Sequence, residues 1–222
     1  MNPTDNGTIH YKDELVRKLI HLCSLSIPII YYFITKETAI IILSILTFTA
    51  LVIDLSRYFS PGFGKIFYKI FGFLLRRHEF DSRKKNLNGA TYVLLSALLG
   101  VILFPKVIFI TAFAILIISD SLAALIGRKY GKHKFLSKSF EGTLTFFVSA
   151  SIVVFFTPKI EGRMAEYMIG IAGAFIGTLA ENLSFGFADD NLTIPLSIGF
   201  TMWIMYGLLL PEVQLILHNV PR

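Results

Sequence analysis

The feature that most constrains this chain is a series of apolar runs that contain no charged residue. Seven such runs follow one another along the 222 residues, at 19–35, 38–53, 87–105, 107–119, 142–158, 167–180 and 191–211. Five of them are close to the roughly 17–25 helical residues that cross a bilayer. The other two are interrupted by Asp120 and Glu181, beyond which they continue to Gly127 and Ala188. The pattern predicts an all-α, polytopic integral membrane protein with about seven transmembrane helices in one domain, 1–222.

The composition excludes an ordinary soluble domain, because only 16% of the residues are charged and the mean hydropathy is +0.66, whereas soluble domains are about 25% charged. The first 18 residues are mixed polar and the run at 19–35 is too long for a signal core, so we expect no cleavable signal peptide. Cys23 is the only cysteine, which excludes an intrachain disulfide.

The distribution of Lys and Arg predicts the orientation. Of the 21 Lys and Arg residues, 16 fall in the N-terminal segment and in alternate loops on one side of the membrane. Basic loops stay cytoplasmic, so we expect a cytoplasmic N-terminus and a C-terminus on the opposite side, in a prokaryotic cytoplasmic or endoplasmic-reticulum-type membrane. Topology and anionic headgroups account for most of the net charge of +6, and we expect no nucleic-acid partner.

The segment 65–80, KIFYKIFGFLLRRHEF, carries apolar residues at helical spacing with interspersed Lys and Arg. It is too charged and too short to span a bilayer, so it predicts an amphipathic helix on the cytoplasmic surface. Two roles remain open for it, membrane anchoring and lining the entrance for a lipid.

The first polar cluster lies where the first apolar run begins, in ELVRKLIH. Glu14, Arg17, Lys18 and His21 are three or four residues apart and therefore share one side of a helix. Arg and Lys at such a position are commonly membrane anchors, but His21 lies inside the apolar run and could bridge helices or hold a phosphate or a proton.

The second cluster is DSLAALIGRKYGKHKFLSKSFEG, which begins with an intramembrane carboxylate. Asp120 lies about 10 Å inside the expected helix end at Gly127, and such a carboxylate is a functional-site hypothesis, with a structural ion pair as the alternative. Beyond it we expect an anion-binding loop in which glycines admit phosphates to the backbone and cations attract them. The residues of this loop and of the next helix start are Gly127, Arg128, Lys129, Gly131, Lys132, Lys134, Lys138, Ser139 and Glu141.

The third cluster is acidic and lies on the same side of the membrane as the cations. Glu181 interrupts an apolar run, and Asp189, Asp190 and Asn191 precede the last one. One of them could simply cap a helix, but the group predicts a Mg²⁺ site, since Mg²⁺ binds one or two carboxylates together with phosphate oxygens. A fourth, weaker cluster is NGATY, at Asn88–Tyr92.

A binding site for a nucleoside triphosphate with Mg²⁺ requires cations for the phosphates and carboxylates for the metal, and the three clusters supply both at one face of the membrane. Phosphoryl transfer itself needs mainly positioning and charge neutralisation. A lipid whose head reaches that face is the simplest acceptor. The alternative is a transporter for an anionic solute. A transport pathway would need polar groups through the whole depth of the membrane, but the halves of the expected helices on the non-cytoplasmic side carry few ionisable groups.

The motifs ELVRKLIH, SDSLAALIGRKYGKHKF, KSFEGT and DDNLTIP together resemble the polyprenol kinase family, which comprises dolichol kinase, phytol kinase and the CTP-dependent diacylglycerol kinases. The resemblance implies a transmembrane catalytic domain that transfers the γ-phosphoryl group of CTP to a lipid alcohol. The second motif also resembles CDP-diacylglycerol synthase, a cytidylyltransferase, but the late PGHGG…DR pattern of that family is absent.

The resemblance also implies residue roles. Arg17 and Lys18 would contact phosphates, and Asp120 would hold the metal. Asp189, Asp190 and Asn191 match the final acidic motif of the family, in which the two aspartates are expected to bind the metal and Asn191 the nucleotide. Gly127 and Gly131 match the glycines of the family, and His21 matches without an assigned role. Lys138 and Glu141 match its K-x-x-E-G turn, where Glu141 is expected to be catalytic. The acceptor lipid and the oligomeric state are left open by these motifs.

Overall fold

The computed structural model describes residues 11–75, 86–183, 189–218, 220 and 221. This part of the chain is almost entirely helical, which confirms the all-α class. Its elements are α1 (Tyr11–Cys23), α2 (Ser26–Phe33), α3 (Lys36–Phe59), α4 (Pro61–Phe71), η1 (Gly72–Leu74), α5 (Gly89–Leu103), α6 (Lys106–Tyr130), β1 (Lys134–Phe135), β2 (Lys138–Ser139), α7 (Phe140–Phe156), α8 (Met164–Leu183) and α9 (Asp190–Leu209).

Each predicted apolar run corresponds to a helix, or to the pair α1–α2, in the described part of the chain. Among the described residues, four spans are long and apolar enough to cross a membrane: Tyr11–Phe33, α3, α6 and α9. Helices α5 and α7 are apolar but have only 15 and 17 residues, and α8 carries Glu166 and Glu181. The count of seven spans and the orientation of the termini therefore stay predictions.

Polar residues between the apolar runs cap the helices, which explains why the helices begin where they do. The Asn88 Oδ1 atom accepts a hydrogen bond from the Thr91 amide at 2.9 Å, and the Ser139 Oγ atom accepts one from the Gly142 amide at 3.1 Å. These caps satisfy amides that have no partner inside the helix. The predicted helix end at Gly127 is wrong, because α6 continues to Tyr130.

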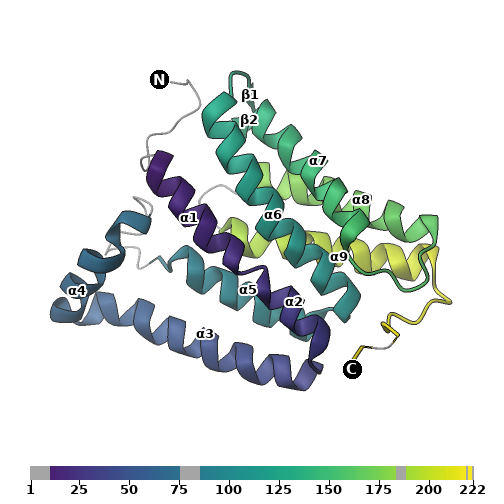
Figure 1. Ribbon diagram of the computed structural model, residues 1–222, viewed down its shortest axis with the longest axis horizontal. Helices are drawn as coiled ribbons and strands as arrows, with labels where there is room; N and C mark the ends of the chain where they lie inside the picture. The colour runs from purple at the N-terminus through teal and green to yellow at the C-terminus, as the bar shows by residue number, and fades with distance from the viewer. Residues whose placement is uncertain (1–10, 76–85, 184–188, 219, 222) are drawn as a thin grey trace.

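The helices run back and forth between two ends of the bundle (Figure 1). The start of α1, the short helix α4 and the β1–β2 hairpin lie at one end, and α9 finishes at the opposite end (Figure 1). The hairpin is antiparallel and pairs Lys134 with Ser139. This arrangement gathers the polar connections that carry the sequence motifs at one end of the bundle.

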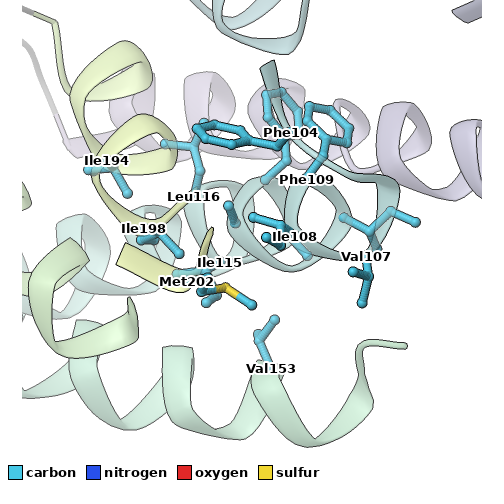
Figure 2. Packing of buried hydrophobic residues seen from close by; sticks show 14 of the residues in the cluster. Phe104, Val107, Ile108, Phe109, Ile115, Leu116, Val153, Ile194, Ile198 and Met202 are labelled. Atoms are coloured by element: carbon cyan, nitrogen blue, oxygen red, sulfur yellow. The ribbon is translucent and has the colours of Figure 1, made fainter. Parts of the chain in front are cut away.

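Helix α6 forms the centre of the core. Its residues Ile108, Ile115 and Leu116 are completely buried, and they pack with residues of α7 and α9 such as Val153 and Ile198 (Figure 2). Large apolar residues on the outer helices are exposed instead, for example Phe48 on α3 at 69% and Phe156 on α7 at 85%. A surface of this kind fits a lipid surrounding better than water.

Glycines bring neighbouring helices close together, as small residues commonly do between helices in membranes. A Cβ atom on Gly170 would lie 2.5 Å from Val154 of α7, and one on Gly177 would lie 2.6 Å from Ile198 of α9. One on Gly100 would lie 2.7 Å from Phe109 of α6. Helix α8 therefore packs closely against α7 on one side and α9 on the other, and α5 packs closely against α6.

The predicted amphipathic helix begins earlier than expected. It spans Pro61–Phe71 and is followed by η1, so the bound at residue 65 is wrong, and residues 76–80 of the predicted segment lie outside the described residues. Pro61 stands in the first turn, where its missing amide hydrogen costs nothing, and Ser60 caps the helix.

Candidate functional site

The residues of α1 and α6 that carry charge meet inside the bundle. Lys18 donates a hydrogen bond to Asp120 Oδ2, and the two side chains are only 3% and 6% exposed. The His21 Nε2 atom lies 3.8 Å from the same carboxylate oxygen. Lys18 and His21 are three residues apart and so face α6 from one side of α1. The structure thus brings three predicted site residues together, with Asp120 at the centre.

A second group of charges surrounds Lys138 on β2. Its ammonium lies 2.6 Å from Glu181 Oε1 on α8 and 3.2 Å from Asp190 Oδ2 on α9. Burial alone would lower the pKa of Lys138, but Asp190, Glu181 and Asp120 outweigh it and raise that pKa above its usual value. The Lys138 ammonium therefore stays charged throughout the neutral range.

Asp189 and Asn191 have a different geometry from Asp190. Asp189 caps α9, since its Oδ1 atom accepts hydrogen bonds from the Asn191 amide at 2.9 Å and from Asn191 Nδ2 at 2.6 Å. Asp190 is the residue of this motif that contacts Lys138. Of the two adjacent carboxylates, Asp190 belongs to the charged cluster and Asp189 orients the helix start and the Asn191 amide.

A third group joins two guanidinium groups through one carboxylate. Glu14 is 4% exposed. Its Oε1 atom lies 2.6 Å from Arg17 Nη2, and its Oε2 atom lies 3.5 Å from Arg128 Nη1 on α6. Two guanidinium groups on one carboxylate leave an excess of positive charge, which suits an anionic ligand. The sequence analysis placed Glu14 on the correct helix face but did not assign it this role.

The remaining predicted cations lie away from the buried cluster. Lys129, Lys132 and Lys134 are exposed, and Lys129 packs over the Tyr130 ring at 5.1 Å. Glu141 contacts His133, which lies between α6 and β1, with 2.8 Å between Glu141 Oε1 and His133 Nδ1. A catalytic role for Glu141 therefore stays a prediction, while its observed contact stabilises the hairpin.

The glycines of the second motif take part in helix packing. Gly127 lies inside α6, and the Gly131 amide donates to Gly127 O at 2.9 Å. A Cβ atom on Gly142 would lie 3.2 Å from Gly127 Cα. Close contact between α6 and the start of α7 explains these glycines, and the predicted approach of phosphate to their backbone stays a prediction.

Two polar networks that the sequence analysis missed hold the site in place. In the first, the Ser137 amide donates to Asn182 Oδ1 at 3.2 Å, and Asn182 Nδ2 donates to Thr143 Oγ1. Asn182 is completely buried. This network fixes the β1–β2 hairpin, and with it Lys138, against α8. The sequence does contain a signal for this network, because Asn182 stands beside Glu181 in an apolar run. A buried side-chain amide is unfavourable without hydrogen-bond partners, so such an Asn indicates a buried polar network.

The second missed network centres on the buried ion pair of Arg57 and Asp54, with 3.0 Å between Arg57 Nε and Asp54 Oδ1. Asp54 Oδ2 accepts from the Asn88 amide at 2.7 Å, and Arg57 Nη2 donates to Asn86 O at 2.7 Å. The guanidinium also lies 5.2 Å from the centre of the Phe67 ring. The pair therefore ties α3, α4 and the start of α5 together.

A pocket of about 360 Å³ adjoins the Lys18–Asp120 pair. One part of its wall is polar, with Arg17, His21 and Asn191 beside that pair. The rest is hydrocarbon and comes mainly from α3, α4, η1 and α5. The charged cluster thus lies next to a space that an apolar molecule can enter.

The carboxylates around Lys138 suit a divalent cation only if a phosphate ligand supplies further oxygen atoms. Within the described residues, no group of three or more His, Cys, Asp or Glu side chains is close enough to hold a metal ion. Two carboxylates nevertheless converge on one ammonium at Lys138, and Mg²⁺ needs only one or two carboxylates when phosphates and water complete its shell. The residues present fit Mg²⁺ bound together with a phosphate ligand.

No protein-family model and no solved structure matches the chain. The uncharacterized protein RP860 of Rickettsia prowazekii is 35% identical over 188 residues, which are 83% of this chain and 90% of that protein. CTP-dependent diacylglycerol kinase 1 of Schizosaccharomyces pombe is 26% identical over 155 residues, which are 64% of this chain and 69% of that kinase. Phytol kinase of a Synechocystis species is 32% identical over 89 residues, 38% of each chain.

Proposed function

We propose that this chain, which belongs to the same family as RP860, is a CTP-dependent kinase of membrane lipid alcohols. The proposal is supported by the chain's distant homologues, which are lipid kinases. It would transfer the γ-phosphoryl group of CTP to a hydroxyl group at the cytoplasmic face. Polyprenols, phytol-type isoprenoids and diacylglycerol are the acceptor classes that this proposal includes.

The observation that carries the proposal is the position of Asp120. Its carboxylate contacts Lys18 and lies beside a pocket whose wall is largely hydrocarbon. On the side of the hairpin, Lys138 joins Glu181 and Asp190 to the same charged cluster. Charged groups suited to a triphosphate and a space suited to a lipid therefore meet at one residue.

The chain's own residues would position and neutralise the phosphates. Arg17 and Arg128, held by Glu14, would bind phosphate oxygens with their planar guanidinium groups. Lys18 and Lys138 would neutralise the phosphate charge that grows during transfer. Asp120, Glu181 and Asp190 are the carboxylates that would hold Mg²⁺, whose chemistry is to offset charge on the transferred group.

In the transfer itself, the acceptor oxygen forms a bond to the γ-phosphorus while the bond from that phosphorus to the β–γ bridging oxygen breaks, which leaves CDP. The hydroxyl proton goes to the imidazole of His21, whose Nε2 atom lies 3.8 Å from Asp120 Oδ2, while Asp120 keeps its role toward Mg²⁺. Imidazole is the side chain most often used to take up a proton in general base catalysis.

The test is an assay of purified protein with CTP labelled either at the γ-phosphate or in the cytidine. Transfer predicts that only the γ label enters the lipid fraction when phytol, a polyprenol or dioctanoylglycerol is present. Cytidine label in the lipid fraction would indicate the cytidylyltransferase alternative. Uptake of a labelled anion into vesicles without any lipid product would support transport and would falsify the kinase proposal.

A further inference from the structure

The pocket beside Asp120 has two chemically distinct parts. Lys18, His21 and Asp120 line one part, whereas Phe67, Phe71 and Leu74 of α4 and η1 line the other. An apolar cavity of about 150 Å³ is large enough for benzene. A pocket of about 360 Å³ therefore has room for roughly a dozen carbon atoms on the same scale.

A buried hydroxyl points to a polar ligand at the charged part. Thr91 of α5 lines the pocket and is only 1% exposed. Its Oγ1 atom has no hydrogen-bond partner within the described ranges of the chain. A buried hydroxyl without a partner is unfavourable, so a ligand whose polar atom bonds to Thr91 Oγ1 is favoured over one that leaves it unpaired.

The pocket also opens sideways to the surface. Ile20 of α1 and Phe71 of α4 both line it, yet they are 51% and 45% exposed. On the outer side of α4, Ile66 and Ile70 are 60% and 53% exposed, as expected for a helix that lies against lipid. A molecule dissolved in the membrane would then reach the pocket past the exposed lining residues Ile20 of α1 and Phe71 of α4 without passing through water.

From these observations we propose that this pocket is the acceptor chamber of the kinase, an inference that rests on the proposed function. The acceptor's hydroxyl lies among Asp120, His21 and Thr91, and its first dozen or so carbon atoms lie against α4 and η1. Helix α4 is thus a wall of the substrate site, and its Phe67 and Phe71 side chains select the shape of the chain that enters.

The chemistry of the wall favours a lipid over the nucleotide base in this chamber. Cytosine and ribose carry donors and acceptors that are expensive to bury against hydrocarbon, and Ala50, Phe67 and Phe71 offer none. A second space of about 560 Å³, between α2, α6 and α7, is also apolar. No Asp, Glu, Lys, Arg or His of the described chain lines it, so it has no group that could act on a hydroxyl.

The Arg57–Asp54 pair explains how the wall is held. Arg57 packs its guanidinium over Phe67 at 5.2 Å and bonds the backbone of Asn86, while Asp54 holds the Asn88 amide. The same pair therefore positions α4 and the α5 turn that carries Thr91. Arg57 and Asp54 are positioning residues for the chamber.

Two variants test the chamber by opposite changes of volume. Ala50 lines it from α3 and is half-buried, so Ala50→Phe fills it with little risk to folding. Phe71→Ala enlarges it at a partly exposed position. The matched control is Ile29→Phe, which adds bulk beside the second space and is on an exposed position of α2.

The kinetic result expected for Ala50→Phe is a rise of about tenfold or more in the KM for phytol and dioctanoylglycerol, because one methylene group in an apolar pocket changes selectivity by about 10–200-fold. The KM for CTP should stay unchanged, and Phe71→Ala should shift the preference toward the bulkier dioctanoylglycerol. Ile29→Phe should change neither constant. A rise with Ile29→Phe and none with Ala50→Phe would overturn the inference.

Photolabelling without CTP separates this inference from the proposed function. A long-chain alcohol that carries a diazirine next to its hydroxyl should label α1, α4 or α5 in the wild type, and Ala50→Phe should reduce the labelling. Label confined to α2 and α7 in a protein that does phosphorylate lipids overturns the chamber alone. Label at α4 in a protein that transfers no phosphate overturns the kinase function and leaves the lipid-alcohol site standing.

Discussion

Lys18 and Asp120 are 102 residues apart in the sequence, and in the folded chain the Lys18 ammonium donates directly to the Asp120 carboxylate. Both side chains are almost completely buried, at 3% and 6% exposure. Neither residue can be removed alone without leaving a buried charge, which is more expensive than the loss of the pair itself. The contact links the catalytic role proposed for Asp120 to the stability of the bundle.

The first prediction follows from this pair. Lys18→Met should lower the free energy of unfolding by about 3–5 kcal/mol, because Asp120 is left as a buried charge. The double variant Lys18→Met with Asp120→Asn should recover most of that loss, while both variants lack activity. Unfolding of detergent-solubilised protein by denaturing detergent measures the difference. Lys12→Met, at an exposed position of the same helix, is the control and should unfold like the wild type.

A second prediction concerns the carboxylate that joins two guanidinium groups. Glu14→Gln should raise the KM for CTP by about tenfold, equal to about 1.4 kcal/mol of lost binding, because Arg17 and Arg128 lose the group that orients them. Steady-state kinetics with saturating acceptor measures this change, and Asp13→Asn on the neighbouring position serves as control. A lower KM for CTP in Glu14→Gln would mean that this carboxylate competes with phosphate instead of orienting the arginines.

The third prediction separates the two adjacent aspartates. Asp190→Asn should reduce turnover and raise the Mg²⁺ concentration needed for half-maximal rate, and its effect should be strongly non-additive with Asp120→Asn. Both variants act on the cluster around Lys138, since Asp190 contacts that ammonium and Asp120 lies close enough to raise its pKa. A double-mutant cycle on turnover measures the coupling. Losses that simply multiply would place the two carboxylates in independent sites.

For the neighbouring residue a structural effect is expected. Asp189→Ala should lower the free energy of unfolding by about 0.5–2 kcal/mol through loss of the α9 cap. Turnover per folded molecule and Mg²⁺ demand should change little. If Asp189→Ala instead raised the Mg²⁺ demand as Asp190→Asn is expected to do, the assignment of the cap to Asp189 and the metal role to Asp190 would be wrong.

The fourth prediction tests the close helix packing with two glycines of α9. A Cβ atom on Gly199 would lie 2.4 Å from the Phe104 ring, so Gly199→Ala should destabilise by about 1–3 kcal/mol through overpacking. A Cβ atom on Gly207 would meet nothing within 4 Å in the described structure. Gly207→Ala should therefore be neutral or stabilising by up to about 1 kcal/mol. Thermal unfolding of the two variants in one detergent compares them directly.

Local sequence was enough to predict the helices and to identify the polar motifs that gather at one end of the bundle. Charge-free runs gave the helices because a backbone in an apolar surrounding must satisfy its own hydrogen bonds. The spacing of Arg17, Lys18 and His21 placed them on one helix face, since that depends only on the helical repeat. The expense of a buried carboxylate was enough to select Asp120.

Local sequence was not enough to predict partners. Nothing near Asp189 or Asp190 distinguishes a cap from a ligand of Lys138, because the difference lies in where β2 and α8 stand relative to α9. The same limit applies to Asp54 and Arg57. In the sequence they resemble ordinary charges at the end of an apolar run, and only the fold shows that they form a buried pair that contacts residues 86–88.

The sequence by itself therefore determined the all-α class, the apolar helices and the gathering of polar motifs between them, because these depend on hydrophobicity and helical periodicity along the chain. Only the tertiary structure decided that Lys18 neutralises Asp120, that Lys138 joins Glu181 to Asp190, and that α4 closes an apolar pocket beside them. Those contacts join segments far apart in the chain, and their geometry follows from how closely the helices pack. The glycines of α6 to α9 permit that packing but do not by themselves specify which side chains meet.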